Sequence, residues 1–301
     1  MESMMAGPLP IEALAERVAS GGEILEADAQ LLLDTPDLIA VGAIADDVRR
    51  GLHGTKTTFV RVFEVHVDAP PAALPPRTTP GEIRIVGKPS SLDMAIAAVT
   101  ATIALGASTP VTGFSLADLS AMDGGALRDI CARLHDAGLV AIADVPIDLL
   151  PDPESAVGAA RAAGLRVSRV TTNAILPERR LEASVRARDL QQVVGGLQAF
   201  APLPAHVSVA SPTTGYDDVK QIAAARLLVT NIPSIQVDWA HYGPKLAQVA
   251  LTMGADDVDG VEATDPGLLG TRRSPLEEIR GNIRAAGLEA VERDGLFVEQ
   301  R

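Results

Sequence analysis

The spacing of apolar residues is helical up to residue 54 and changes after it. Three stretches in this first part carry apolar residues every three or four positions. Each ends at glycine or just before proline, which are common helix stops. The stretches are LPIEALAERVASG, LEADAQLLLDT and PDLIAVGAIADDVRRGLHG. The sequence therefore predicts an N-terminal helical cap over residues 1–54.

After residue 54, β-prone runs are separated by longer helical runs. The predicted strands cover residues 57–67, 82–87, 110–114, 139–145, 165–171, 198–203, 235–239 and 258–261. The predicted helices cover residues 91–106, 124–137, 153–163, 177–194, 216–231, 243–253 and 275–286. Strands and helices in regular alternation are typical of a (β/α)8 barrel. We therefore predict an α/β protein with a TIM-type barrel over residues 55–301, ending in a helix and a tail.

An open, doubly wound sheet is the main alternative to the barrel. Nucleotide-binding proteins with open sheets often carry a Gly-x-Gly-x-x-Gly or Walker A loop after a strand. Neither motif occurs in the sequence, so the barrel is favoured. One connection is unusual for either fold. The loop after the first predicted strand, DAPPAALPPRTTPG, contains five prolines and no cysteine.

Charge and hydropathy limit the classes of partner. The net charge is −13 and no local basic patch is present, so nucleic-acid phosphates and anionic membrane surfaces would be repelled. The longest nearly apolar run, residues 94–107, is too short to cross a bilayer. The N-terminus lacks the basic start and apolar segment of a signal peptide. We expect a cytoplasmic protein that binds neither nucleic acid nor membrane.

Cysteine is scarce, which limits the metal and redox chemistry. The one cysteine, Cys131, lies in the helical pattern ALRDICARLHDAGL and is expected to be a small buried side chain. One cysteine excludes an intramolecular disulfide, a CxxC redox pair and a three-cysteine iron–sulfur motif within this sequence. The acidic run GADDVDGVEA does not have the spacing of an EF-hand. We therefore expect no metal and no cofactor.

Chemistry in a (β/α)8 barrel lies at the carboxyl ends of the strands. The first strand presents Glu64 and His66 on one side by alternation, so they are candidates for an acid–base pair. The alternative is a hydrogen-bonded polar pair at the barrel mouth. Asp144 and Asp148 after the fourth strand are better explained as turn acids, and Lys88 is a weak candidate for a Schiff base.

The later strands supply candidate binding residues, for which ordinary strand ends and helix caps are the alternative. Arg169, Thr171 and Asn173 on the fifth strand could hold a carboxylate or hydroxyls of a ligand. His241 is the third catalytic candidate, beside the first-strand pair. The remaining predicted binding residues come from the sixth and seventh strands: Gln198, His206, Asp238, Trp239 and Tyr242.

Several segments carry a resemblance to a known family. They are TTGYDDVKQIAAARLLVTNIPSIQVDWAHYGPKLAQVALTMGADDVDG, GGLQAFAPLPAH, TPDLIAVGAIADDVRRGLHG and IRAAGLEAVERDGLF. Together they resemble the radical S-adenosylmethionine enzymes of the futalosine route to menaquinone, above all aminofutalosine synthase. The dehypoxanthinyl futalosine cyclase and the FO synthase subunits are next in similarity. The resemblance implies a radical-SAM type of barrel.

The resemblance also implies a departure from the family's chemistry. Its members carry Cys-x3-Cys-x2-Cys after the first strand, where three thiolates hold a [4Fe–4S] cluster. The matching positions fall near Ala73, Arg77 and Pro80, and none of these side chains is a cluster ligand. The loop therefore looks like the remnant of a cluster loop. The glycine-rich fourth-strand segment of the family appears here as AIADVPIDLL, and the fifth-strand segment is shortened to TTNAILPERRLEA.

Three functions fit this combination of residues. The first is a non-catalytic protein of the menaquinone pathway that binds an intermediate or a cysteine-bearing radical SAM paralogue. The second is an enzyme that performs acid–base chemistry on a futalosine-like or chorismate-derived small molecule. The third is a structural or regulatory pseudoenzyme with a collapsed pocket. The polar groups predicted at the strand ends favour a small-molecule ligand.

Overall fold

The N-terminal cap contains three helices, as predicted. The computed structural model describes residues 10–106, 108–174, 179–206, 213–265, 267 and 274–300. The helices are α1 (Pro10–Ala19), α2 (Glu26–Asp34) and α3 (Leu38–His53). The carboxylate of Asp37 accepts a hydrogen bond from the Ala40 N–H at 3.0 Å and so begins α3. Gly54 ends it with a φ of 62°, which a residue without a side chain adopts easily.

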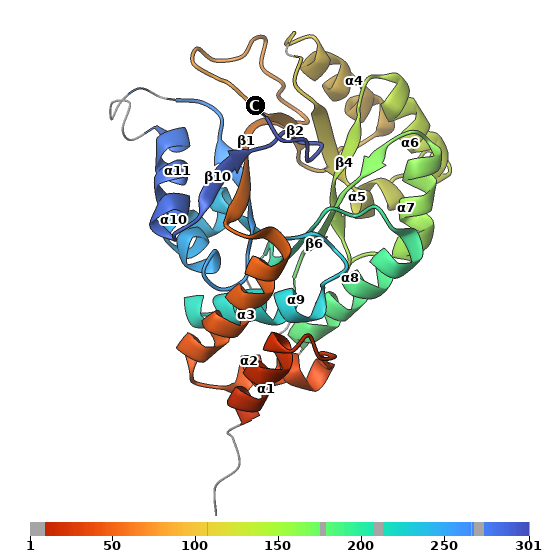
Figure 1. The fold of residues 1–301 in the computed structure, drawn as a ribbon. Coiled ribbons are helices and arrows are strands. Elements are labelled where there is room, and N and C mark those ends of the chain that lie inside the picture. The colour runs from red at the N-terminus through yellow and green to blue at the C-terminus, as the bar shows by residue number, and fades with distance from the viewer. Residues whose placement is uncertain are drawn as a thin grey trace, which may run out of the picture.

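Eight parallel strands form a closed barrel, so the predicted fold is confirmed (Figure 1). The order around the barrel is β1-β2-β3-β4-β6-β7-β8-β9, and β9 pairs back with β1. Two short strands lie beside it: β5 (Arg166–Val167) pairs with β4, and β10 (Glu289–Glu292) pairs with β1. The barrel strands are β1 (Lys56–His66), β2 (Glu82–Val86), β3 (Val111–Ser115), β4 (Ala141–Pro146), β6 (Arg169–Thr172), β7 (Ala199–Pro204), β8 (Ser234–Asp238) and β9 (Asp257–Glu262).

Helices cover the outside of the barrel except between β1 and β2, which residues 67–81 connect without a helix (Figure 1). This loop is held by backbone hydrogen bonds to the segment after β9, from Thr79 N–H to Ala263 O and from Asp265 N–H to Arg77 O. The outer helices are α4 (Leu92–Ile103), α5 (Leu116–Ser120), α6 (Leu127–Asp136), α7 (Pro153–Ala162), α8 (Arg180–Val194), α9 (Gly215–Leu228), α10 (Trp239–Ala250) and α11 (Pro275–Ala285).

Some element boundaries differ from the prediction. The helix expected at 243–253 begins at Trp239, because the Asp238 carboxylate caps the His241 N–H at 2.8 Å. The helix kinks at Gly243, whose φ of 78° and following proline hid its true start. The strand expected at 165–171 is divided into β5 and β6, and neither α5 nor β10 was predicted. Residues 177–178 of the predicted 177–194 helix lie outside the described residues.

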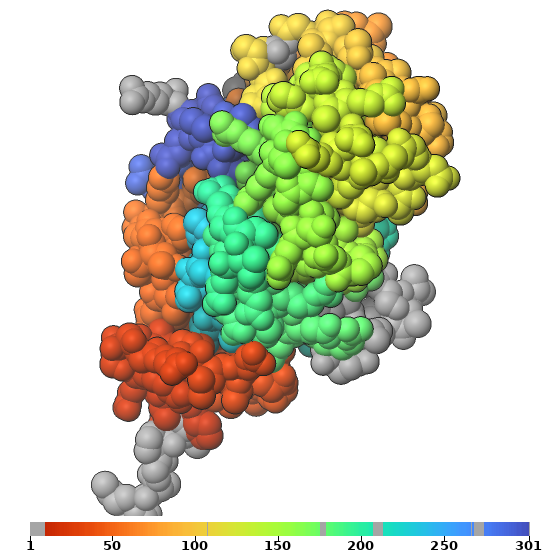
Figure 2. Space-filling view, turned by 90° about the vertical axis from the view of Figure 1, so that its right-hand side faces the viewer, coloured from red at the N-terminus to blue at the C-terminus, as the bar shows by residue number. Residues whose placement is uncertain are grey.

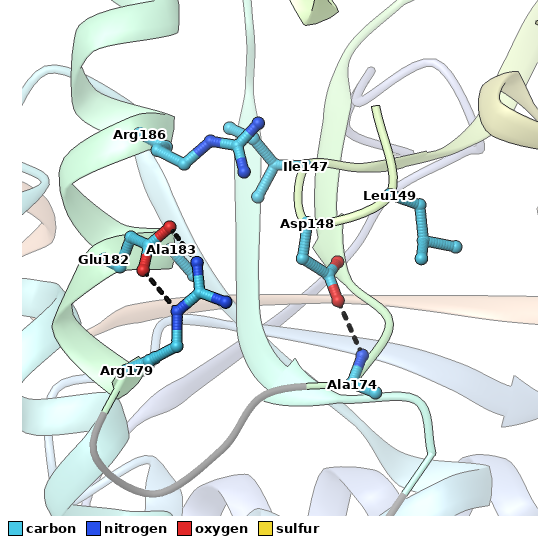
Figure 3. A pocket seen from close by; sticks show the side chains of 8 residues that line it. All are labelled: Ile147, Asp148, Leu149, Ala174, Arg179, Glu182, Ala183 and Arg186. Carbon is cyan, nitrogen blue, oxygen red and sulfur yellow. Dashed lines mark hydrogen bonds and ion pairs between the residues drawn. The ribbon is translucent and has the colours of Figure 1, made fainter. Parts of the chain in front are cut away.

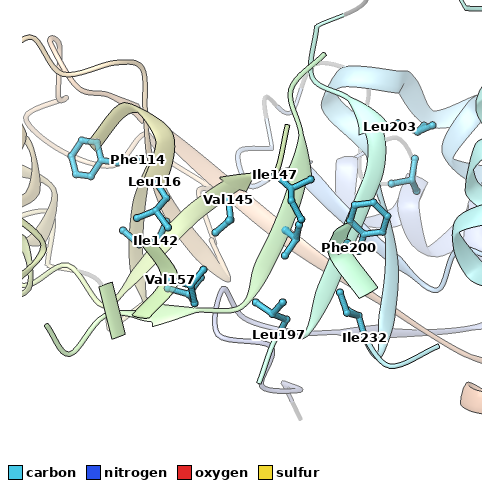
Figure 4. Packing of buried hydrophobic residues seen from close by; sticks show 14 of the residues in the cluster. Phe114, Leu116, Ile142, Val145, Ile147, Val157, Leu197, Phe200, Leu203 and Ile232 are labelled. Atoms are coloured by element: carbon cyan, nitrogen blue, oxygen red, sulfur yellow. The ribbon is translucent and has the colours of Figure 1, made fainter. Parts of the chain in front are cut away.

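The main apolar core lies between the barrel and its outer helices. Aliphatic side chains of the strands pack against leucines and alanines of the helices, as expected for a chain poor in aromatic residues (Figure 4). Phe114, Val145 and Phe200 are at most 2% exposed in this layer. No helix in the described part of the chain is long and apolar enough to cross a membrane.

The N-terminal cap has a smaller core of its own. Leu14, Leu32 and Val41 pack with Val219 and Leu227 of α9. The cap therefore rests on the barrel mainly through α9, and the space-filling view shows it as the red base beneath the barrel (Figure 2). The division of the chain into a cap over residues 1–54 and a barrel over residues 55–301 remains a proposal.

The chain's last segment closes the amino end of the barrel. Arg293, directly after β10, donates two hydrogen bonds of 2.7 Å to Asp257 at the start of β9. The guanidinium of Arg293 lies 4.0 Å from the ring centroid of Phe297, and the Gly295 N–H bonds to Gly81 O. This segment therefore covers part of the amino end of the barrel, and the cavity described below lies at the opposite end.

Candidate functional site

A cavity of about 430 Å³ lies at the carboxyl ends of the strands, where barrel enzymes place their chemistry. We call it the mouth cavity. Its walls come from seven of the eight barrel strands, all except β9, and from the segments that follow them. Most of the predicted site residues line it: Glu64, Arg169, Thr171, Asn173, His206, Asp238, His241 and Tyr242.

Three predicted site residues lie elsewhere. His66 is the exposed last residue of β1, with its Nδ1 3.6 Å from the Asp68 carboxylate. Gln198 precedes β7 at the amino end of the barrel and donates a long hydrogen bond to Gly196 O. Trp239 is 9% exposed and packs in the main core. The expected acid–base pair is therefore separated: Glu64 lines the mouth cavity and His66 does not.

The floor of the mouth cavity is a buried ion-pair network around Arg84. Its guanidinium donates two hydrogen bonds to Glu82, at 2.8 and 2.9 Å, and two to Asp259, at 2.8 and 2.9 Å. Burial alone would lower the pKa of Arg84, but Asp259 and Glu82 outweigh it and raise that pKa. Arg84 is thus a permanent cation with four of its five N–H donors already used.

Arg169 joins the same network from β6, across the barrel from β1. It donates to Asp259, and its second terminal nitrogen lies 2.9 Å from Asp144 on β4. Burial would raise the pKa of Asp259, but Arg169 and Arg84 hold it well below its ordinary value. The barrel interior is therefore filled by paired charges, where many barrels have layers of branched aliphatic side chains.

Glu64 and Asp238 are the acids of the mouth cavity without a cation. Neither makes an ion pair with another described residue, and they come from β1 and β8 on either side of β9. Burial raises the pKa of Glu64; Arg84 opposes this, while Asp238, Asp259 and Glu262 add to it. Burial also raises the pKa of Asp238, with a further contribution from Asp259.

This environment of Glu64 predicts a pH dependence of stability. An acid with a raised folded pKa stabilises the fold while protonated, so its contribution is present below the ordinary pKa of 4.5 and is lost as pH rises above it. Glu64→Gln removes that titration. The difference in free energy of unfolding, variant minus wild type, should therefore increase from acidic to neutral pH in urea titrations. A difference that is constant or decreases with pH would contradict the raised pKa.

The rim of the mouth cavity carries an aromatic pair. The rings of His241 and Tyr242 meet edge to face with centroids 5.0 Å apart. The Tyr242 hydroxyl donates to Pro204 O at 2.6 Å, and burial raises the pKa of this phenol. Tyr242 is therefore a fixed, neutral part of the wall. His241 is exposed and accessible to a ligand.

A second, smaller cavity of about 180 Å³ lies between the loop after β4 and α8 (Figure 3). Asp148 lines it but is occupied, since its carboxylate accepts from the Asn173 and Ala174 N–H groups at 2.7 and 2.8 Å. Arg179 pairs with Glu182 on the opposite wall. Asp148 is thus the turn acid that the sequence indicated, and the mouth cavity remains the stronger candidate site.

The residues of the cavity floor were not predicted from the sequence. Glu82, Arg84 and Asp259 were not singled out as site residues, although β2 reads EIRIV. Charged and aliphatic positions alternate in this strand. Because helices cover the outer face of a barrel and need an aliphatic surface, the charged face has to point inward. That signal was available in the sequence.

The groups that could hold an iron–sulfur cluster are absent where the family resemblance would place them. Ala73, Arg77 and Pro80 lie in the loop after β1 and carry no thiol. Cys131 lies on α6, fully buried, and burial raises the pKa of its thiol to about 11. A buried thiol of that pKa is a poor source of thiolate. The residues present therefore do not fit a [4Fe–4S] cluster.

Comparisons with known proteins confirm the sequence relationship. No family model matches the chain. Aminodeoxyfutalosine synthase of Thermus thermophilus is 38% identical over 141 residues, which cover 41% of this chain and 37% of that protein. The 5-amino-6-(D-ribitylamino)uracil–L-tyrosine 4-hydroxyphenyl transferase of Methanococcoides burtonii is 34% identical over 137 residues, 40% of this chain and 38% of that protein. The match thus spans well under half the length of these relatives.

Solved structures agree on the fold. The [FeFe]-hydrogenase maturase HydG from Carboxydothermus hydrogenoformans superposes with a TM-score of 0.63, covering 93% of this chain and 79% of that one. The sequences are 12% identical, so this likeness speaks for the barrel alone. Over 141 residues the chain is thus similar to aminodeoxyfutalosine synthase, and its fold is the barrel expected from that resemblance.

Proposed function

We propose that the chain is a cluster-free relative of the aminodeoxyfutalosine synthases that binds a small molecule in the mouth cavity and performs no radical chemistry. The observation that carries this proposal is the mouth cavity itself: it is open, charged and lined by no cysteine. Radical chemistry on S-adenosylmethionine needs a cluster to deliver an electron, and the residues after β1 offer it no ligand.

A purely structural role is less well supported. A pseudoenzyme with a collapsed pocket would fill the mouth of the barrel with side chains. Here a volume of about 430 Å³ remains, which is within the usual range of small-molecule sites. We include in this proposal a role in the menaquinone pathway. The bound molecule would be a pathway intermediate, and a cysteine-bearing radical SAM paralogue would be the partner protein.

A second candidate function is acid–base catalysis in the same cavity. Glu64, with its raised pKa, and His241 both line the mouth cavity, so a proton donor and an acceptor face the same space. Turnover of a bound ligand that is lost in Glu64→Gln and His241→Ala, with binding retained, would favour this function over binding alone.

A ligand panel tests the proposed function. S-adenosylmethionine, futalosine and aminodeoxyfutalosine are each added to the protein while the unfolding temperature is measured. A ligand at about one hundred times its dissociation constant should stabilise the fold by about 2.7 kcal/mol, which is a shift of several degrees.

The matched control is a pair of variants. Asp238→Ala should abolish the shift, while Asp93→Asn on the exposed surface of α4 should leave it unchanged. A shift equal in wild type and Asp238→Ala would place the ligand outside the mouth cavity. The absence of any shift across the panel would favour the structural role.

A further inference from the structure

We propose that the mouth cavity takes a ligand with a protonated amine, held between Glu64 and Asp238. This inference rests on the proposed function and adds the chemical class of the ligand. It follows from the distribution of charge over the cavity walls, from one buried hydroxyl, and from the aromatic rim.

The two arginines of the mouth cavity, Arg84 and Arg169, at first sight suggest a site for an anion. Arg84 spends four hydrogen bonds on Glu82 and Asp259. Arg169 bonds to Asp259 and lies 2.9 Å from Asp144. An anionic ligand would have to compete with these buried carboxylates for the two guanidinium groups. The arginines therefore serve the floor of the cavity.

Two acids of the mouth cavity, Glu64 and Asp238, have no cation as partner within the described residues. Around these two cations stand three carboxylates that they already bond, and Glu64 and Asp238 add two more at the level of the open cavity. The barrel order β8-β9-β1 brings them to neighbouring walls. The side of the mouth cavity formed by these strands is thus negative, without a described cation to balance it. A ligand ammonium would provide the missing charge.

A buried hydroxyl on β6 is an independent sign of a ligand. Thr172 on β6 lines the mouth cavity and is 1% exposed, yet its hydroxyl has no hydrogen-bond partner within the described residues. Buried hydroxyls normally have partners. A polar group of the ligand opposite its amine would satisfy this hydroxyl, and the His241–Tyr242 pair adds an aromatic surface to the lining of the cavity.

The test uses two matched sets of probes that differ only in charge. One set is 5′-amino-5′-deoxyadenosine, adenosine and adenosine-5′-carboxylic acid, and the other is benzylamine, benzyl alcohol and benzoate. Binding is measured by isothermal titration calorimetry at neutral pH, at physiological salt and with EDTA present. In at least one set the amine should bind about tenfold more tightly than its neutral and anionic counterparts, as expected for a charge-assisted hydrogen bond.

Variants identify the residues that carry the preference. Glu64→Gln and Asp238→Asn should each reduce the affinity for the amine about tenfold and leave the neutral probe unchanged. Asparagine also caps a helix, so Asp238→Asn keeps the start of α10. Asp93→Asn, exposed on α4 and absent from the cavity lining, should alter neither affinity.

Two results would overturn the inference, and they are distinguishable. An anionic probe that binds as tightly as its amine, or a preference that survives in both cavity variants, would overturn the amine assignment and leave the proposed function standing. If no member of either set binds and the ligand panel above also fails, the proposed function falls with it.

Discussion

Asp259→Asn should lower the free energy of unfolding by about 3–5 kcal/mol, because it removes one partner from a buried ion-pair network. Asp259 is 1% exposed and bonds to both Arg84 and Arg169. An asparagine cannot neutralise two guanidinium groups. Glu82 and Asp144 would remain, but the shared central charge would be lost.

Urea denaturation at neutral pH measures this effect, with Asp93→Asn as the control. Asp93 also pairs with an arginine, but both side chains are exposed, so its replacement should cost less than about 1 kcal/mol. A double-mutant cycle with Arg84→Met should show that the second change costs less once Asp259 is gone. Additive effects would mean that the two residues do not act as a network.

Arg293→Met should have a similar effect at the other end of the barrel. The Arg293 guanidinium is 2% exposed at most and makes two 2.7 Å hydrogen bonds to Asp257, which is itself fully buried. Without it, Asp257 keeps the side-chain hydrogen bonds from Thr58 and Gln236 but has no cation. We expect a loss of about 3–5 kcal/mol from the uncompensated carboxylate.

The same variant should also loosen the C-terminal segment. Phe297 stacks on the Arg293 guanidinium, so residues 293–300 would lose their anchor over the amino end of the barrel. Limited proteolysis should therefore cleave this segment faster in Arg293→Met than in the surface variant Arg133→Met. Unchanged cleavage together with a loss of stability below about 1 kcal/mol would contradict the closing role.

The barrel was predictable because its strands and helices have clear and different periods. The predicted element boundaries were wrong where local interactions outweighed the apolar periodicity. Trp239 reads as the end of a β-prone run, but Asp238 caps a helix that starts there, and Gly243 with Pro244 disguises the first turn. Strand β10 was not predicted because its sequence, EAVE, contains only two aliphatic residues. Its strand conformation depends on hydrogen bonding to β1, which the local sequence does not show.

The site was predictable in part, for a reason of geometry. Alternation along a strand says which side chains share a face, and the end of the strand says which lie at the mouth, so Glu64, Arg169 and Asp238 were found. Neither rule shows how charges from different strands combine. The network of Arg84 with Asp259 joins β2 to β9, residues 175 positions apart, and only the closed barrel brings them together.

The claim that the protein carries no iron–sulfur cluster is tested by anaerobic reconstitution of the purified chain with iron and sulfide, followed by desalting and analysis of iron, sulfide and visible absorbance. A radical SAM protein with an intact Cys-x3-Cys-x2-Cys motif, treated in parallel, is the positive control. We predict only trace iron, equal in wild type and Cys131→Ala. About four irons and four sulfides per chain, retained on gel filtration with cluster absorbance, would contradict the claim.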